Sequence, residues 1–190
     1  MNDQDIFISK LYDALNFAIK HHGEVLQVRK STNIPYIIHP VGVMQILLRH
    51  TDDPEIIQAG ILHDIIEDTK GTAQDIEKAF GTRVKNLVLG ASEPDHEDAE
   101  WEDRKRHTVN YVATEAPTDV LYVICADKLH NFSTIVEDHQ KLGENVWKKF
   151  HRGKDEQRWY YEAMSEAILS RDKKNPLFKE FYRIVHDFFK

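Results

Sequence analysis

The sequence contains a single cysteine, Cys125, among its 190 residues. One cysteine excludes an internal disulfide and any zinc site built from several cysteines. Long uninterrupted apolar runs are also missing, so we expect no membrane-spanning helix. The N-terminal segment lacks the basic start of a secretory signal, because Asp3 and Asp5 stand there. These absences together predict a soluble, cytoplasmic protein.

An excess of positive charge is missing as well. The formal net charge is −7 at pH 7, which argues against nucleic acid and anionic membrane as partners. Local basic groups remain at Arg29-Lys30, at Arg104-Lys105-Arg106 and between Lys148 and Lys154. Each group is either an anion-binding patch or a solvated helix face.

The alternating pattern of a half-buried strand is scarce, and helical spacing of apolar residues dominates instead. The pattern from Asp5 to His22 predicts a helix that Gly23 is suited to end. Asp53 before Pro54 is a natural N-cap, and Thr72 followed by Asp75 resembles a capping box. A chain of this length suits one domain. We therefore expect an all-α fold, a single compact bundle of about eight to ten helices over residues 1–190.

Later helices are less sharply bounded by the sequence. We expect a helix from Thr72 to Gly81 and an acidic loop with an exposed His96 at residues 93–98. The remaining helices are predicted over residues 82–89, 99–114, 119–137, 145–150, 154–170 and 176–189. Repeats, low-complexity tracts and linkers are not apparent.

Four ionisable side chains crowd the otherwise apolar run from Gly60 to Thr69. They are His63, Asp64, Glu67 and Asp68. We expect one helix to carry all four, with the second pair one turn after the first. Burial of so many polar groups costs several kcal/mol unless a metal or other partners satisfy them. The run is therefore the first place to look for chemistry.

Two further residues are awkward for a purely structural role. His39 precedes Pro40 at a helix entry, and Asp127 follows the apolar run 120–126. Alone, His39 is a capping or hydrogen-bonding residue and Asp127 pairs with a nearby cation. The order His, His-Asp, Asp favours a mixed nitrogen and oxygen site for manganese, iron, zinc or cobalt, with coordination positions left open for catalysis.

Segments of the chain resemble a known family. Residues 35–40, 59–69, 80–88 and 125–131 carry the patterns PYxxHP, HDxxEDT, a Phe-Gly pair and ADKLHN. In this order they are similar to the HD-domain metal-dependent phosphohydrolases, and more closely to the (p)ppGpp hydrolase domain of RelA/SpoT proteins and to stand-alone small alarmone hydrolases. The resemblance covers about residues 15–165, and we expect helices within 166–190 to pack on that domain.

The resemblance implies a role for each matching residue. One divalent metal, typically Mn²⁺ with other divalent transition metals as alternatives, would be held by His39, His63, Asp64 and Asp127. Glu67 and Asp68 would stand beside the attacking water, with Glu67 favoured for the water side. Substrate contacts would come from Arg29, Lys30, Lys128, Asn131 and Tyr160. The alternatives are that Lys128 pairs with a carboxylate, Asn131 caps a helix and Tyr160 is a core aromatic.

The predicted activity is removal of the 3′-pyrophosphate from (p)ppGpp or a related (p)ppNpp nucleotide, which gives GDP or GTP and pyrophosphate. One alternative is an HD-type phosphohydrolase for a nucleoside mono- or triphosphate, and another is a non-catalytic nucleotide-binding protein. A cyclic-dinucleotide phosphodiesterase is disfavoured because the chain has no Gly-Tyr-Pro tripeptide. The preferred base, the regulatory context and the presence of a homo-oligomer stay open at this point.

Overall fold

The computed structural model describes residues 2–30, 32–92 and 100–190. Within these ranges the regular structure is helical, apart from one isolated bridge between Val28 and Pro35. The prediction of an all-α bundle is confirmed. In chain order the helices are α1 (Asp3–Glu24), α2 (Ile38–Leu47), α3 (Pro54–Leu62), α4 (Ile65–Asp68), α5 (Ala73–Phe80), α6 (Thr82–Ala91), α7 (Trp101–Thr114), α8 (Thr118–Leu142), the 3-10 helix η1 (Gly143–Lys149), α9 (Lys154–Arg171) and α10 (Pro176–Phe188).

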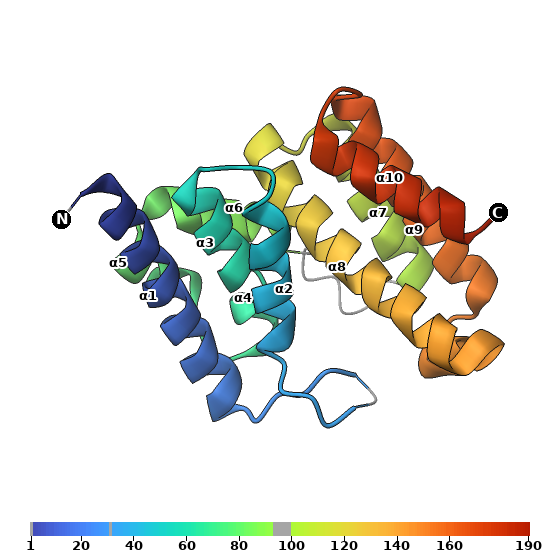
Figure 1. The fold of residues 1–190 in the computed structure, drawn as a ribbon, viewed down its shortest axis with the longest axis horizontal. Helices are drawn as coiled ribbons and strands as arrows, with labels where there is room; N and C mark the ends of the chain where they lie inside the picture. The colour runs from blue at the N-terminus through green and yellow to red at the C-terminus, as the bar shows by residue number, and fades with distance from the viewer. Residues whose placement is uncertain (1, 31, 93–99) are drawn as a thin grey trace.

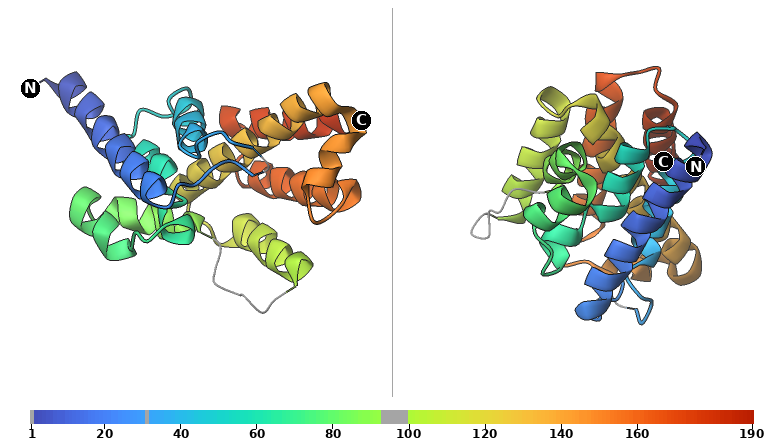
Figure 2. Two further views of the ribbon diagram at one scale, coloured as in Figure 1. Left: turned by 90° about the horizontal axis from the view of Figure 1, so that it is seen from below. Right: turned by 90° about the vertical axis from the view of Figure 1, so that its left-hand side faces the viewer.

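The long helix α8 is the central element of the molecule. Figure 1 shows it running between a group formed by α1 to α6 and a second group formed by α7, α9 and α10. It packs on α2, α3 and α6 of the first group and on α9 and α10 of the second. The two termini lie at opposite ends of the long axis, and Figure 2 shows the two groups from the side. Residues of α8 are therefore placed to contact both groups.

Helix α3 occupies the interior of the first group. Every residue from Ile56 to Leu62 is buried, because α1, α2, α6 and α8 all pack against this helix. A helix surrounded in this way is apolar on every face rather than on one stripe. The apolar run that precedes His63 thus delivers the end of α3 into the interior.

The predicted helix starts rest on side-chain caps. Asp53 accepts hydrogen bonds from the backbone of Glu55 and Ile56, and Pro54 takes the first position of α3. Thr72 and Asp75 form the capping box at the start of α5. Gly81 ends that helix at a φ of 88°, where a residue without a side chain is favoured. These caps confirm the boundaries that polar residues predicted.

Other boundaries differ from the sequence prediction. Gly23 does not end α1, which continues one residue further, through Glu24. Helix α8 extends to Leu142, and the segment predicted as a helix over 145–150 is the 3-10 helix η1. The predicted acidic loop at 93–98, with His96, lies outside the described residues.

The prediction of one continuous helix through residues 60–69 is wrong. Helix α3 ends at Leu62, residues 63 and 64 form a turn, and α4 begins at Ile65. The imidazole Nδ1 of His63 donates to the backbone oxygen of Gly60 at 2.8 Å, and that oxygen is the acceptor a continuous helix would use for the backbone N–H of Asp64. The side chain therefore replaces a helical hydrogen bond and interrupts the helix.

Among the described residues, no helix combines the length and the apolar character needed to cross a membrane.

Candidate metal centre

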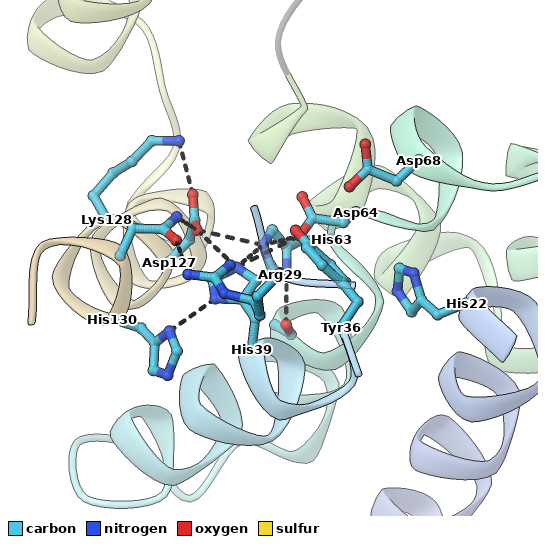
Figure 3. A network of polar contacts seen from close by, with 12 residues as sticks. His22, Arg29, Tyr36, His39, His63, Asp64, Asp68, Asp127, Lys128 and His130 are labelled. Carbon is cyan, nitrogen blue, oxygen red and sulfur yellow. Dashed lines mark hydrogen bonds and ion pairs between the residues drawn. The ribbon is translucent and has the colours of Figure 1, made fainter. Parts of the chain in front are cut away.

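Four side chains from three parts of the chain converge between the two helix groups. His39 comes from α2, His63 and Asp64 from the turn after α3, and Asp127 from α8. The Nε2 atoms of His39 and His63 are 3.2 Å apart. Asp64 Oδ2 lies 3.0 Å from His63 Nε2, and Asp127 Oδ1 lies 3.1 Å from His39 Nε2. Figure 3 shows all four pointing toward a common centre.

Close contact between α2 and α3 brings the two histidines together. A Cβ atom at Gly60 would lie 2.3 Å from a methyl carbon of Leu47, so only glycine lets the helices approach this closely. Val43 is also within contact distance of that position. The apolar packing of α2 on α3 therefore sets the position of the polar centre.

Both histidines present Nε2 to the centre because Nδ1 is engaged elsewhere. Since the Gly60 oxygen only accepts, His63 Nδ1 carries the proton of that bond. His39 Nδ1 lies 2.8 Å from Nδ1 of His130, a second imidazole on α8. When His39 Nδ1 donates to His130, the Nε2 lone pair is free for a cation. This arrangement of outer hydrogen bonds is typical of metal-binding histidines.

The two carboxylates of the centre are paired with positive charge. Burial acts to raise the pKa of Asp127, but Lys128 and the two histidines outweigh it and hold the pKa well below its usual value. Asp64 behaves in the same way, with His63 as its main partner. Burial lowers the pKa of His39, whereas the two carboxylates hold the pKa of His63 well above its usual value. A proton on His63 thus takes the place where positive charge is needed.

The donor set fits a divalent metal ion. Ligand atoms of His39, His63 and Asp64 all lie within 4.8 Å of one another, and the short contact to His39 adds Asp127. Two imidazole nitrogens and two carboxylate oxygens suit a borderline transition metal, and four protein ligands leave open positions in an octahedral site. The centre suggests a divalent metal, with room for water or substrate.

Residues that the sequence assigned to the substrate surround Asp127 instead. Lys128 Nζ donates to Asp127 Oδ2 at 2.7 Å, and Asn131 Nδ2 donates to Asp127 Oδ1 at 2.6 Å. Arg29 donates to the Oδ1 atom of Asn131 at 3.0 Å, and its guanidinium lies 5.7 Å from the ring centre of Tyr36. Both cations are therefore near the centre: Lys128 binds the carboxylate of Asp127 directly, and Arg29 is linked to it through Asn131.

Two residues of the centre were missed from the sequence. Tyr36 donates its hydroxyl to Asp64 Oδ2 at 2.5 Å, and His130 contacts His39. Both stand inside the motifs quoted above, PYxxHP and ADKLHN. Their position one turn or less from the candidate ligands was the available signal.

Glu67 and Asp68 lie at the exposed end of the centre, on α4. Asp68 Oδ2 accepts a hydrogen bond of 2.8 Å from the side-chain amide of Gln27. Figure 3 places Asp68 and His22 on the side of Asp64 away from Lys128 and His130. Asp68 is thus separated from Lys128 and His130.

Two cavities flank the centre. The smaller, of about 320 Å³, is lined by Lys30, Trp101, Lys105, Lys128, Asn131, Phe150, His151, Arg152, Gln157, Tyr160 and Tyr161. Its charged lining contains cations and no carboxylate among the described residues. Tyr160 is buried, with the ammonium of Lys105 at 5.1 Å from its ring centre, so it combines core packing with a position in the cavity wall.

The larger cavity, of about 660 Å³, has a mixed lining. Its lining includes the cations Arg29 and Lys141, the carboxylates Glu137 and Asp138, and apolar side chains such as Ile34. It shares Lys30, Asn131, Phe150 and Tyr161 with the smaller cavity. The two cavities therefore meet beside Asp127, which Asn131 contacts directly.

Comparison with known proteins identifies relatives along most of the chain. A protein of Mus musculus named guanosine-3′,5′-bis(diphosphate) 3′-pyrophosphohydrolase MESH1 is 33% identical over 175 residues, which are 90% of each chain. The protein of the same name from Danio rerio is 35% identical over 123 residues, or 66% of its length. The bifunctional (p)ppGpp synthase/hydrolase SpoT of Escherichia coli is 37% identical over 120 residues, so the chain spans only 16% of that relative.

Solved structures agree with this relationship. A crystal structure from Listeria monocytogenes EGD-e superposes with a TM-score of 0.72 at 35% identity and covers 80% of this chain and 98% of its own. A structure described as a metazoan ortholog of SpoT superposes with a TM-score of 0.74 at 23% identity, which shows a common fold. A family model described as HD domain matches residues 14–153, the part of the chain that contains all four convergent side chains. The chain belongs to the HD domain family.

Proposed function

We propose that the protein is a metal-dependent hydrolase that removes the 3′-pyrophosphate of (p)ppGpp or a related (p)ppNpp nucleotide. The observation that carries the proposal is the meeting of four metal-type donor atoms beside a cavity whose charged lining is cationic in the described residues. The names of the relatives, one of which matches 90% of both chains, support the substrate.

The residues at the centre divide between holding the ion and moving protons. His39, His63, Asp64 and Asp127 would hold the ion, for which we propose Mn²⁺ because the mixed donor set suits it. A bound divalent cation would lower the pKa of a water and offset charge on the attacked phosphate. Glu67 and Asp68 are the groups proposed to accept and deliver protons.

The reaction is a hydrolysis of the bond between the 3′ oxygen and its phosphorus. The water oxygen forms a bond to the phosphorus carried by the 3′ oxygen, and the bond between that phosphorus and the 3′ oxygen breaks. One carboxylate takes the proton of the water, and the 3′ oxygen receives a proton and leaves as the ribose hydroxyl. The products are pyrophosphate and GDP or GTP.

The two cavities suit the remaining parts of such a nucleotide. The cationic lining of the smaller cavity, with Lys30 and Lys128, suits the 5′-phosphates. The mixed lining of the larger cavity, with Arg29 beside apolar side chains, suits the base and ribose. In this placement Asn131 lies at the junction and Tyr160 in the wall of the phosphate cavity. Residues 1–190 would act as one hydrolase domain, since α7 and α9 supply cavity walls while α2, the turn after α3 and α8 supply the ligands. A cytoplasmic location stays a prediction.

The test is product analysis. Purified protein with Mn²⁺ and ppGpp should release pyrophosphate and GDP in equal amounts, resolved by ion-exchange chromatography, and a chelator should stop the release. Asp64→Ala should abolish it, whereas Asp187→Ala, which changes an exposed aspartate near the C-terminus, should not. Release of phosphate or triphosphate from GTP or ATP in place of pyrophosphate from ppGpp, or equal activity in Asp64→Ala, would overturn the proposal.

A further inference from the structure

Asp68 is held by a chain of two side chains that reaches into the core. Gln27 Nε2 donates to Asp68 Oδ2 at 2.8 Å, and Gln27 Oε1 lies 2.6 Å from Nδ1 of His22. A carboxylate only accepts, so the amide nitrogen of Gln27 must face Asp68 and the amide oxygen must face His22. His22 Nδ1 is therefore the donor, and both hydrogen bonds point toward the carboxylate.

The burial of His22 favours a neutral ring with its proton on Nδ1. The side chain is 3% exposed, and burial lowers its pKa, so the ring is neutral at neutral pH. Its Nε2 atom is buried and has no hydrogen-bond partner within the described structure. With the single ring proton on Nδ1, an unsatisfied Nε2 is left inside the protein, which has a free-energy cost of about 1 to 3 kcal/mol. A purely structural core position would not favour an imidazole here.

The backbone of Gln27 is fixed as firmly as its side chain. Its N–H donates to the oxygen of His22 at 3.1 Å, and its oxygen accepts from the N–H of Tyr36 at 3.0 Å. The preceding residue, Leu26, has a φ of 50°, a left-handed conformation that costs a leucine about 1 kcal/mol or more. Leu26 is also 85% exposed, so apolar burial does not explain its conformation. The strained turn places Gln27 between His22 and Asp68.

The same histidine supports the metal centre from a second direction. Its ring packs against the ring of Tyr36 with the centres 4.9 Å apart, and the Tyr36 hydroxyl donates to Asp64. His22 is thus connected to the candidate ligand Asp64 through Tyr36 and to the candidate acid–base residue Asp68 through Gln27.

We infer that Gln27 and His22 are positioning residues that hold the Asp68 carboxylate in one orientation. This inference rests on the proposed hydrolase function. Because Gln27 occupies Oδ2, Oδ1 is the atom left to take the proton of the water. The inference therefore assigns the water side to Asp68, whereas the sequence favoured Glu67. A hydrogen bond to an ionised acceptor that also fixes geometry is worth a factor of about 10 to 100 in rate.

The test separates positioning from structure with paired variants. Gln27→Met keeps the length of the side chain without its donor, and we expect kcat to fall about 10- to 100-fold with little change in KM. His22→Leu should lower kcat similarly, whereas His22→Asn, whose amide N–H can replace Nδ1–H, should recover most of the rate. Gln58→Met is the matched control, because Gln58 donates to the backbone of Lys10 away from the centre.

Two readouts do not depend on turnover. Nitrogen-15 NMR of the imidazole should show His22 as the Nδ1–H tautomer in the wild-type protein, with a changed signal in Gln27→Met. Calorimetric titration should show that Gln27→Met binds Mn²⁺ as the wild type does. A wild-type kcat in Gln27→Met, equal rates in His22→Asn and His22→Leu, or an Nε2–H tautomer would each overturn the inference. Absence of pyrophosphate release from the wild type would instead refute the proposed function, while the tautomer remains measurable.

Discussion

Replacement of Gly42 by alanine should weaken metal binding without touching a ligand. Gly42 lies on α2, three residues after His39, and faces the imidazole of His130. An alanine Cβ would lie 2.0 Å from His130 Nε2 and 2.1 Å from Cδ2. Non-bonded carbon and nitrogen atoms are in contact at about 3.5 Å, so the imidazole of His130 must move away by roughly 1.5 Å. The larger cavity beside His130 gives the ring room to move.

That movement should break the hydrogen bond that orients His39. The two Nδ1 atoms are 2.8 Å apart, and a displacement of this size exceeds the range of a hydrogen bond. Loss of an outer hydrogen bond to a metal-binding histidine reduces metal affinity by about 10- to 100-fold. We therefore expect the dissociation constant for Mn²⁺ to rise by this factor, equivalent to about 1.4 to 2.7 kcal/mol.

Calorimetric titration of the metal-free protein with Mn²⁺ measures the effect directly. Gly23→Ala is the matched control, because a Cβ there has no atom within 4 Å. His130→Ala should weaken binding similarly, and the double variant Gly42→Ala/His130→Ala should be no weaker than His130→Ala alone. An affinity of Gly42→Ala within twofold of the wild type would refute the reasoning, as would additive losses in the double variant.

Three further outcomes are expected. Arg83→Met should lower the free energy of unfolding by about 1 kcal/mol at low salt, since Arg83 joins α3, α6 and α8 through three acidic partners. Arg83 holds the pKa of Asp53 below its ordinary 3.8. The difference in unfolding free energy between wild type and Arg83→Met, measured by urea titration, should therefore be largest at pH 7 and disappear as the pH falls through the lowered pKa. The lowered pKa of buried His22 means that the unfolded chain binds its proton first, so stability should decline as the pH falls below about 6.5. His22→Asn should show a smaller decline in the same urea titrations, and an equal decline would contradict the assignment. Leu26→Gly should raise the free energy of unfolding by about 1 kcal/mol by relieving the left-handed conformation, whereas Val25→Gly, at a φ of −99°, should lower it in thermal unfolding.

Much of the fold followed from local chemistry. Capping residues such as Asp53 and Thr72 act within one turn of their own position, so the sequence around them predicts the helix start. Apolar spacing also predicted the all-α class. The end of α1 was misplaced by one residue, since Gly23 was selected by residue type alone and the helix runs through Glu24.

The candidate site was also predicted only in part from the sequence. Residue type and order were sufficient to select the four side chains that the fold brings together, since few combinations of histidine and aspartate occur in apolar surroundings. The turn at His63 was not predicted, because it depends on a side chain that bonds to the Gly60 oxygen. His130 and Gln27 were not singled out, because each contacts the site through a residue far away in the sequence. His130 contacts His39, 91 residues away, and Gln27 contacts Asp68, 41 residues away.

The position of α8 between the two helix groups has a thermodynamic consequence. The metal centre combines donors from α2 and the turn after α3 with Asp127 from α8, the helix on which α9 and α10 also pack. An ion held there binds only when the first helix group is folded and docked on α8. By mass action, an ion concentration 100 times the dissociation constant would raise the free energy of unfolding by about 2.7 kcal/mol. The ion would thus couple the unfolding of α2 and of the turn after α3 to the unfolding of α8, the helix that the second group also contacts.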